Sequence, residues 1–343
     1  MPTKQNEDFL AILIELPHND ALSGGLIGVP PINTDDPIRV GKQKAEQILA
    51  GRRLALEKRK RALAEREKKL RFDIRATTPA GLGPVATQET AGFLLAVGDS
   101  WFDYPFHDVL KLLEDEEGYD IESAAHRGDP IESMAYQGGQ LDKFARCLEK
   151  ILARGAKPKA VLLSGGGDDI AGKEFGMLLN NATSSIAGWN SEILDGVIND
   201  RVLTAYKSIT TSITEICAQH AIPNIPILVH GYDYPVPDGR GFAGGWPFPG
   251  PWLEPGFDEK LFTNLQTNVG LMRDLIDRFN RMLSGFSQDA SFTNIRYIDL
   301  RGTLSTDLTN NAYQQWWANE LHPTEDGFDR VTERFEEVLA QLP

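Results

Sequence analysis

The chain has 343 residues, a length that allows one large domain or two smaller ones. Its 41% hydrophobic and 24% charged residues are typical of a soluble globular protein, and its net charge of −14 argues against nucleic acid as a general partner. Two cysteines, Cys147 and Cys217, give neither a disulfide framework nor metal-ligand spacing, and no apolar run is long enough for a transmembrane segment.

The first 91 residues are predicted to form an N-terminal extension. The apolar run Phe9–Leu16 could be a short strand or a helix, but Glu7 and Asp8 precede it and Glu15 interrupts it. It is too short and too acidic for a secretory signal. Cytoplasmic residence is therefore the default expectation, and export without a classical signal peptide stays open.

A long basic helix is predicted at about residues 37–72, where Ala, Leu, Glu, Lys and Arg dominate. Between Ile38 and Phe72 there are thirteen Lys or Arg and four Asp or Glu, a local charge of +9 against −23 for the remainder. The sevenfold spacing of a coiled-coil seam is followed by Leu49, Leu56, Leu63 and Leu70. The favoured interpretation is a solvated helix on the acidic body of its own domain. The alternative is a contact with a second copy, a partner or an anionic surface.

A Gly- and Pro-rich linker is predicted over residues 73–91, and the main domain over 92–343. In the main domain apolar runs alternate with helical patterns, which predicts an α/β fold with a parallel five-stranded sheet and helices on both faces. The strand candidates are Phe93–Val97, Tyr119–Ala124, Ala160–Leu163, Ile225–His230 and Ile295–Leu300. The helices are expected at about 106–117, 131–153, 201–220, 259–283 and 325–341. Two long loops, at roughly 172–200 and 231–258, are expected to be functional, the second as an aromatic wall or lid.

Residues able to do chemistry gather where the predicted strands end. Gly98-Asp99-Ser100 follows the first strand, at the sheet edge where open α/β sheets bind their ligands. Taken alone, this triplet is more often a turn and a helix N-cap. Three further segments are expected at the same edge: His126–Pro130, Ser164–Ile170 and Asn319–Thr324. A serine nucleophile needs an adjacent base, and His322 is the histidine that has amide and acidic neighbours just before it.

In the order and placement of these four segments, residues 92–343 resemble the GDSL, or SGNH, hydrolase superfamily. The resemblance implies a three-layer α/β/α sandwich with a flavodoxin-like sheet. It implies that Ser100 is the nucleophile, and that its backbone N–H, Gly128 and residue 168 form an oxyanion hole. It also implies that His322 is the base and that residue 319 orients it. No cofactor and no metal are expected.

Two positions depart from the family pattern. The family has an asparagine donor where this chain has Asp168, and an ionised carboxylate cannot donate a hydrogen bond and repels an oxyanion. Either burial near Asp169 keeps Asp168 protonated, or another group takes its role, or the site is weak or disabled. The orienting acid is replaced by Asn319, so a Ser-His dyad is expected, with the Asn319 oxygen, a backbone carbonyl or Glu320 fixing the imidazole of His322.

The leading hypothesis is a serine ester hydrolase that acts on a lipid, an aryl ester or an acylated sugar. Its pocket is expected to be walled by aromatic residues, for each of which core packing is the alternative. These residues are Trp101, Tyr104, Trp189, Tyr232, Trp246, Trp316 and Trp317.

Two other functions are weighed against this hypothesis. The first is a binding or scaffold protein on a hydrolase fold, with chemistry weakened at Asp168 and Asn319 and a partner or second copy bound through the basic helix. The second, less favoured, is a metal-assisted phosphodiesterase that binds Mg²⁺ or Ca²⁺ through hard oxygen ligands. Its ligands would be Asp99, Asp103, Asp168 and Asp169.

Overall fold

The computed structural model describes residues 36–73, 90–172, 174–245 and 248–342. The chain divides into two units, Met1–Asn33 and Thr34–Pro343. The apolar run Phe9–Leu16 and residues 74–89 of the predicted linker lie outside the described residues. The domain boundary predicted near residue 92 therefore stays a prediction.

Five parallel strands form the central sheet, in the order β2-β1-β3-β6-β7. Their bounds are β1 Gly92–Val97, β2 Tyr119–Ser123, β3 Pro158–Leu163, β6 Ile227–His230 and β7 Ile295–Ile298. The apolar runs are the central strands, and Leu94–Val97 of β1 is fully buried because helices cover both faces. This strand order is the flavodoxin-like one, so the fold class that the sequence and the family resemblance predicted is confirmed.

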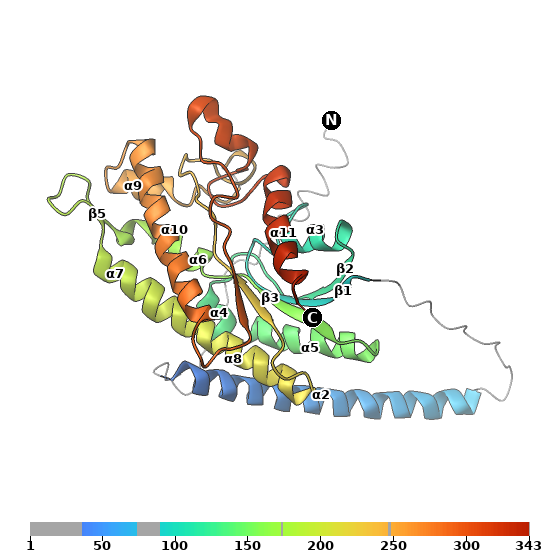
Figure 1. Cartoon of the computed structure of the whole chain (residues 1–343). Coiled ribbons are helices and arrows are strands. Elements are labelled where there is room, and N and C mark those ends of the chain that lie inside the picture. The colour runs from blue at the N-terminus through green and yellow to red at the C-terminus, as the bar shows by residue number, and fades with distance from the viewer. Residues whose placement is uncertain (1–35, 74–89, 173, 246–247, 343) are drawn as a thin grey trace. The chain divides into compact units, whose positions relative to one another are not determined.

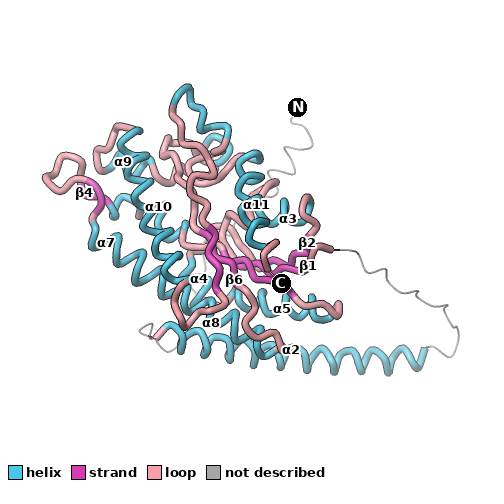
Figure 2. The backbone as a smooth tube through the Cα atoms, in the orientation of Figure 1, coloured by secondary structure: helices cyan, strands magenta, loops and turns pink. Residues whose placement is uncertain are grey.

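Helices form a layer on each face of the sheet (Figures 1 and 2). Helices α3 (Val109–Asp115) and α11 (Glu325–Leu339) contact each other on one face. The other face is covered by α5 (Gly139–Ala153), α8 (Leu203–Gln219) and α10 (Leu265–Ser287). Right-handed crossovers require this division, because the chain moves one way across the sheet from β1 to β2 and the opposite way afterwards.

Short elements complete the described part of the chain. The short α-helices are α4 Ile131–Tyr136, α6 Gly167–Ile170, α7 Ser191–Asp195 and α9 Glu254–Glu259. Single helical turns or π-type segments are η2 Phe175–Leu178, η3 Gly196–Val202, η4 Phe242–Gly244 and η5 Thr309–Gln315. A two-stranded antiparallel ribbon joins β4 (Leu179–Asn180) to β5 (Gly188–Trp189).

Three of the predicted helices have different bounds in the structure. The helix expected at 131–153 is divided into α4 and α5, because Gly138 takes a left-handed conformation (φ 84°). The helix expected at 106–117 begins only at Val109, where the Asp108 carboxylate caps it by accepting from the backbone N–H of Lys111. The helix expected from 259 begins at Leu265, where Asn264 provides the same kind of cap.

The predicted basic helix is α2, Pro37–Asp73, and its first part packs on the outer surface of α8 and α5 (Figure 1). Gly41 allows the close approach, since a Cβ there would lie 2.7 Å from Cβ of Thr211. Ser212 donates to the Gly41 carbonyl over 2.8 Å, and Arg52 forms an ion pair with Glu149. This part of α2 is thus a fourth layer of the same compact unit. None of the described helices combines the length and the apolar character that crossing a bilayer requires.

Candidate active site

Ser100 lies in the turn that follows β1, beside the end of β3. Gly98 makes this turn possible, because a Cβ at this position would lie 2.8 Å from Cβ of Ser164. The side chain of Gln140 holds the same backbone unit from both sides, accepting from the Gly98 N–H over 3.0 Å and donating to its carbonyl over 2.9 Å. The Gln140 side chain therefore fixes the backbone turn that carries the serine.

The structure brings Ser100, His322 and Asn319 into one hydrogen-bonded chain. Oγ of Ser100 lies 2.7 Å from Nε2 of His322, and Nδ1 of His322 lies 3.1 Å from Oδ1 of Asn319. The same Oδ1 accepts from the backbone N–H groups of Leu321 and His322, which identifies it as the oxygen of the amide. The imidazole therefore donates from Nδ1 and accepts the serine proton at Nε2.

His322 is buried and held by rings on two sides. Tyr104 stacks on it with 4.3 Å between ring centroids, and the Trp252 ring meets it edge-on at 5.7 Å. Burial lowers the pKa of His322 to about 3. At neutral pH the imidazole is therefore uncharged and free to accept a proton, as a general base must be.

Glu320 lies beside the triad but its carboxylate is directed into the aromatic loop. It accepts from the backbone N–H groups of Gly239, Trp252, Leu253 and Glu254, over 2.6–3.0 Å. The alternative in which Glu320 orients the imidazole does not match this geometry, since all these partners belong to another loop. Its role is to anchor the segment that carries Trp252 against His322.

Asp99 organises the interior of the site. Its carboxylate accepts from the hydroxyl of Ser164 over 2.6 Å, from the backbone N–H of Trp101 over 3.0 Å and from the hydroxyl of Tyr232. The Tyr232 hydroxyl in turn accepts from the N–H of Gly167, the residue before Asp168. Asp99 thus connects the ends of β1, β3 and β6, a role that its sequence position did not reveal.

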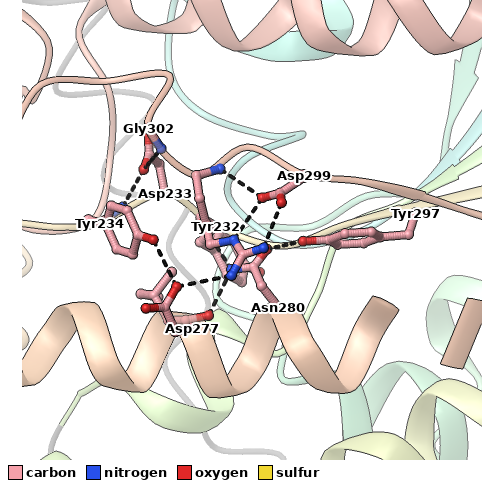
Figure 3. A network of polar contacts seen from close by, with 10 residues as sticks. Tyr232, Asp233, Tyr234, Asp277, Asn280, Tyr297, Asp299 and Gly302 are labelled. Carbon is pink, nitrogen blue, oxygen red and sulfur yellow. Dashed lines mark hydrogen bonds and ion pairs between the residues drawn. The ribbon is translucent and has the colours of Figure 1, made fainter. Parts of the chain in front are cut away.

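A network behind the site fixes Tyr232 and the loop that carries it (Figure 3). The Asp233 carboxylate accepts from the backbone N–H groups of Gly302 and Leu304, over 2.8 and 2.6 Å. Asn280 of α10 donates to the Tyr232 carbonyl and accepts from the hydroxyl of Tyr297. The loops after β6 and β7 are therefore joined to each other and to α10 at the back of the site.

Asp168 is half-buried and lines the same cavity as Ser100. Within the part of the chain that the structure describes, its carboxyl makes no hydrogen bond or ion pair. Burial, and after it the negative charges of Asp99, Asp169 and Asp129, raise the pKa of Asp168 well above its ordinary value. A carboxyl in this environment keeps its proton to a higher pH than usual.

Two other aspartates of the metal-site alternative have separate partners. Asp103 accepts from the backbone N–H and the Nε of Arg127, and Asp169 accepts from the N–H of Ile131 at the start of α4. Over residues 36–73, 90–172, 174–245 and 248–342 there is no group of three or more His, Cys, Asp or Glu side chains suited to a metal ion. The four aspartates do not form the oxygen cage on which the metal hypothesis depended.

Gly128 lies in an exposed turn with φ 78°, beside the Gly98 turn. Its neighbour His126 donates its backbone N–H to the Gly98 carbonyl over 2.9 Å, which joins the two turns. No hydrogen bond among the described residues uses the backbone N–H of Gly128 or that of Ser100. Both N–H groups are thus unpaired donors, although Gly128 is not among the residues that line the cavity.

The cavity at Ser100 measures about 50 Å³. Three of the predicted wall residues line it, Trp101, Tyr232 and Trp317. Further walls that the sequence reasoning missed are Pro235, Leu253, Met272, Leu275, Ile276 and Leu321. The three from α10 could not be singled out in the sequence, because they belong to an apolar helix face that is equally typical of core packing.

The other predicted wall residues that the structure describes are not among those that line the cavity. Tyr104 packs on His322 and its hydroxyl accepts from Nδ2 of Asn319 over 3.1 Å. Trp189 donates to the Leu271 carbonyl and packs on Phe175, and Trp316 lies beside the Arg330 guanidinium. Trp246 lies outside the described residues. Trp252 of the same loop contacts His322.

A larger groove of about 580 Å³ adjoins the cavity. The two share Asp168, Ile170 and Ala171. The groove is more polar than the cavity, with Glu132, Gln137, Asp169, Glu174 and Arg201 in its walls. Asp168 thus stands between a small apolar cavity and a wide polar groove.

No family model matches the chain, and no curated protein matches it. Among solved structures, a GDSL-like lipase from Bacteroides thetaiotaomicron is similar at 9% identity and a TM-score of 0.36, over 73% of this chain and 88% of that one. A catalytic mutant of an acetylxylan esterase from Geobacillus stearothermophilus is similar at 15% identity and a TM-score of 0.37, over 73% of this chain and 94% of that one. A gut microbial diltiazem-metabolizing enzyme is similar at 12% identity and a TM-score of 0.42, over 75% of this chain and 48% of that one. At these identities and TM-scores the likenesses say nothing about activity, and the fold assignment rests on the strand order.

Proposed function

We propose that the protein is a serine ester hydrolase with a Ser100-His322-Asn319 site. The observation that carries the proposal is the hydrogen-bonded chain from the Ser100 hydroxyl through His322 to Asn319, with His322 uncharged. The serine oxygen attacks the acyl carbonyl while Nε2 of His322 takes its proton. The imidazole then gives this proton to the departing alcohol, and a water molecule activated in the same way releases the acid.

Three donors are proposed to stabilise the tetrahedral oxyanion. Two are the unpaired backbone N–H groups of Ser100 and Gly128. The third is the carboxyl of Asp168, which in its neutral form carries an O–H and can donate as the family's asparagine does. The raised pKa of Asp168 and its lack of a partner among the described residues support this role. The proposed reaction uses no cofactor and no metal ion.

Substitution of the nucleophile tests the proposal. We expect Ser100→Ala to lower kcat/KM for p-nitrophenyl acetate by at least about 10³-fold, because the variant lacks the oxygen that would attack the acyl carbon. The matched control is Ser184→Ala, which removes an exposed hydroxyl in the loop between β4 and β5 and should leave kcat/KM unchanged. Equal hydrolysis by wild-type and Ser100→Ala proteins, or none by either across a range of esters, would refute the proposed function.

A further inference from the structure

The small cavity is placed to receive the part of a substrate that is bound directly to the reacting carbon. Its lining includes Ser100 and Asp168, the proposed nucleophile and the proposed oxyanion donor. Beyond these two residues its walls are mainly hydrocarbon, from Leu253, Met272 and Trp317 among others. A carbonyl attacked by Ser100 and bound by Asp168 would direct one substituent into this space, and the apolar walls suit an alkyl group rather than a charged one.

The volume of the cavity limits the size of that substituent. An apolar protein cavity of about 150 Å³ accommodates benzene, a ring of six carbons. In proportion, the roughly 50 Å³ beside Ser100 accommodates on the order of two carbons. An acetyl or a propanoyl group fits, whereas the chain of an octanoyl ester or of a long-chain lipid does not.

The walls leave little scope for expansion. The side chains of Leu275, Leu253 and Met272 are each at most 2% exposed and belong to the continuous core of the unit. Close-packed interiors resist additional methylene groups, because each one displaces side chains from their preferred rotamers. The adjoining groove has an order of magnitude more volume than the cavity, so the structure restricts the acyl part far more than the alcohol part.

We infer that the protein is selective for esters of very short acids, acetyl and propanoyl, with the acyl group in the cavity formed by α10, Trp317 and Leu253 and the alcohol in the adjoining groove. This inference rests on the proposed function, since it identifies the acyl pocket of the same Ser100 site. Among lipid, aryl and acylated-sugar esters, it excludes long-chain lipids. In the reaction the Ser100 oxygen forms a bond to the short acyl carbon as the bond to the alcohol oxygen breaks, and the serine proton passes through His322 to that alcohol.

A chain-length series tests the inference with the wild-type protein alone. The substrates are the p-nitrophenyl esters of acetate, propanoate, butanoate, hexanoate and octanoate. We expect kcat/KM for acetate or propanoate to exceed that for octanoate by at least about 100-fold. If hydrolysis depends on Ser100 and octanoate is cleaved as fast as acetate, the inference is overturned while the proposed function stands. If no ester is cleaved in a Ser100-dependent way, the proposed function itself fails.

Truncation of the wall tests where the acyl group lies. Met272→Ala removes about three heavy atoms from the cavity wall and should raise the butanoate-to-acetate ratio of kcat/KM at least about tenfold. The matched control is Met282→Ala, which truncates another buried methionine of α10 that is not a cavity wall. Its chain-length preference should equal that of the wild type.

A milder variant covers the case in which Met272→Ala does not fold. Ile276→Val removes a single carbon from the same wall, a change that most cores tolerate. It should raise the propanoate-to-acetate ratio at least about twofold. An unchanged preference in a folded wall variant would overturn the assignment of the acyl group to this cavity.

Discussion

At the scale of single residues, the site depends on groups whose charge is set by burial. Burial lowers the pKa of His322 to about 3, so the base is unprotonated from mildly acidic pH upwards. Burial and neighbouring carboxylates raise the pKa of Asp168, so its proton is retained above the usual range. The proposed reaction needs His322 without its extra proton and Asp168 with its proton. Activity is therefore expected between the lowered pKa of His322 and the raised pKa of Asp168.

This gives a prediction for the pH dependence of kcat/KM. As the pH rises through the pKa of Asp168, the carboxyl loses its O–H and becomes a repulsive charge beside the oxyanion, so activity falls. Asp168→Asn replaces this group by an amide that donates at every pH. We expect the variant to match or exceed the wild type above the pKa of Asp168 and to lose this decline with rising pH, as measured with p-nitrophenyl acetate.

The matched control for this prediction is Asp169→Asn. Burial raises the pKa of Asp169 to about 6, but its carboxylate accepts from the Ile131 N–H, a bond that an asparagine oxygen can also form. The decline should persist in this variant but shift to lower pH, because the charge of Asp169 helps to raise the pKa of Asp168. If the decline is the same in Asp168→Asn as in the wild type, Asp168 is not the titrating donor.

The residue scale also shows what the sequence could reveal about the site. Ser100 and His322 could be named because each lies beside a predicted strand or helix end, and parallel strands bring such ends to one edge of the sheet. Asp168 also follows a predicted strand, but its expected role came from the family resemblance. The role of Glu320 could not be predicted, because its partners are backbone N–H groups of a loop about 70 residues away. Backbone donors leave no pattern in the side-chain sequence.

At the scale of elements, the buried carboxylate of Glu320 holds the part of the aromatic loop around Trp252 against the site. Glu320 accepts four N–H groups from this loop, and its side chain has no exposure to solvent. The loop in turn supplies Trp252, which packs on His322, and Leu253, which lines the cavity. The geometry of the imidazole and the shape of the cavity therefore depend on the same anchor.

We expect Glu320→Gln to lower the free energy of unfolding by about 2–3 kcal/mol, because the amide group would present donors to backbone N–H groups that need acceptors. We also expect kcat/KM to fall, since Trp252 and Leu253 would no longer be held in place. Chemical denaturation and ester hydrolysis measure the two effects. Glu259→Gln on α9 is the matched control, because that side chain is exposed, and it should change neither quantity. Unchanged stability of the Glu320 variant would contradict its role as anchor.

Element bounds were predictable where an apolar run or a cap marks them, and less so where the backbone itself changes direction. The strand Phe93–Val97 was predicted to within one residue of β1, because a buried strand is a continuous apolar run. The division of residues 131–153 into α4 and α5 was not predicted. Its cause is the left-handed conformation of Gly138, and an isolated glycine in a helical pattern is often accommodated without a break.

At the scale of the whole unit, α2 adds a layer to the fold at a distance from the proposed active site. It packs on the outer surface of α8 and α5, whereas the proposed site lies at the ends of β1 and β3 on the edge of the sheet. The favoured interpretation of the basic segment, a helix on its own domain, matches the packing of its first part. Contact of the helix with a second copy or a partner stays a prediction.

If α2 contributes stability but not catalysis, a change at its contact with α8 should separate the two. At Gly41 a Cβ would meet the Ser208 carbonyl and lie 2.7 Å from Cβ of Thr211, so Gly41→Ala forces the helices apart. We expect the free energy of unfolding to fall by about 1–3 kcal/mol through this overpacking. The value of kcat/KM per folded molecule should stay unchanged, because α2 packs mainly on α8 and α5 rather than on the strand ends that carry Ser100 and Asp168.

The control for this experiment lies ten residues further along the same helix. A Cβ at Gly51 would have no atom within 4 Å, so Gly51→Ala adds only helix propensity and should raise the free energy of unfolding by about 0.5–1 kcal/mol. If Gly41→Ala lowers the free energy of unfolding and Gly51→Ala raises it, the loss of stability comes from the contact with α8 and not from the replacement of a glycine as such. A loss of activity in Gly41→Ala at full folding would instead mean that the outer layer acts on the site through α8. Tyr206 of α8 is the route for such coupling, because its hydroxyl donates to the carbonyl of Gly165 in the loop before Asp168.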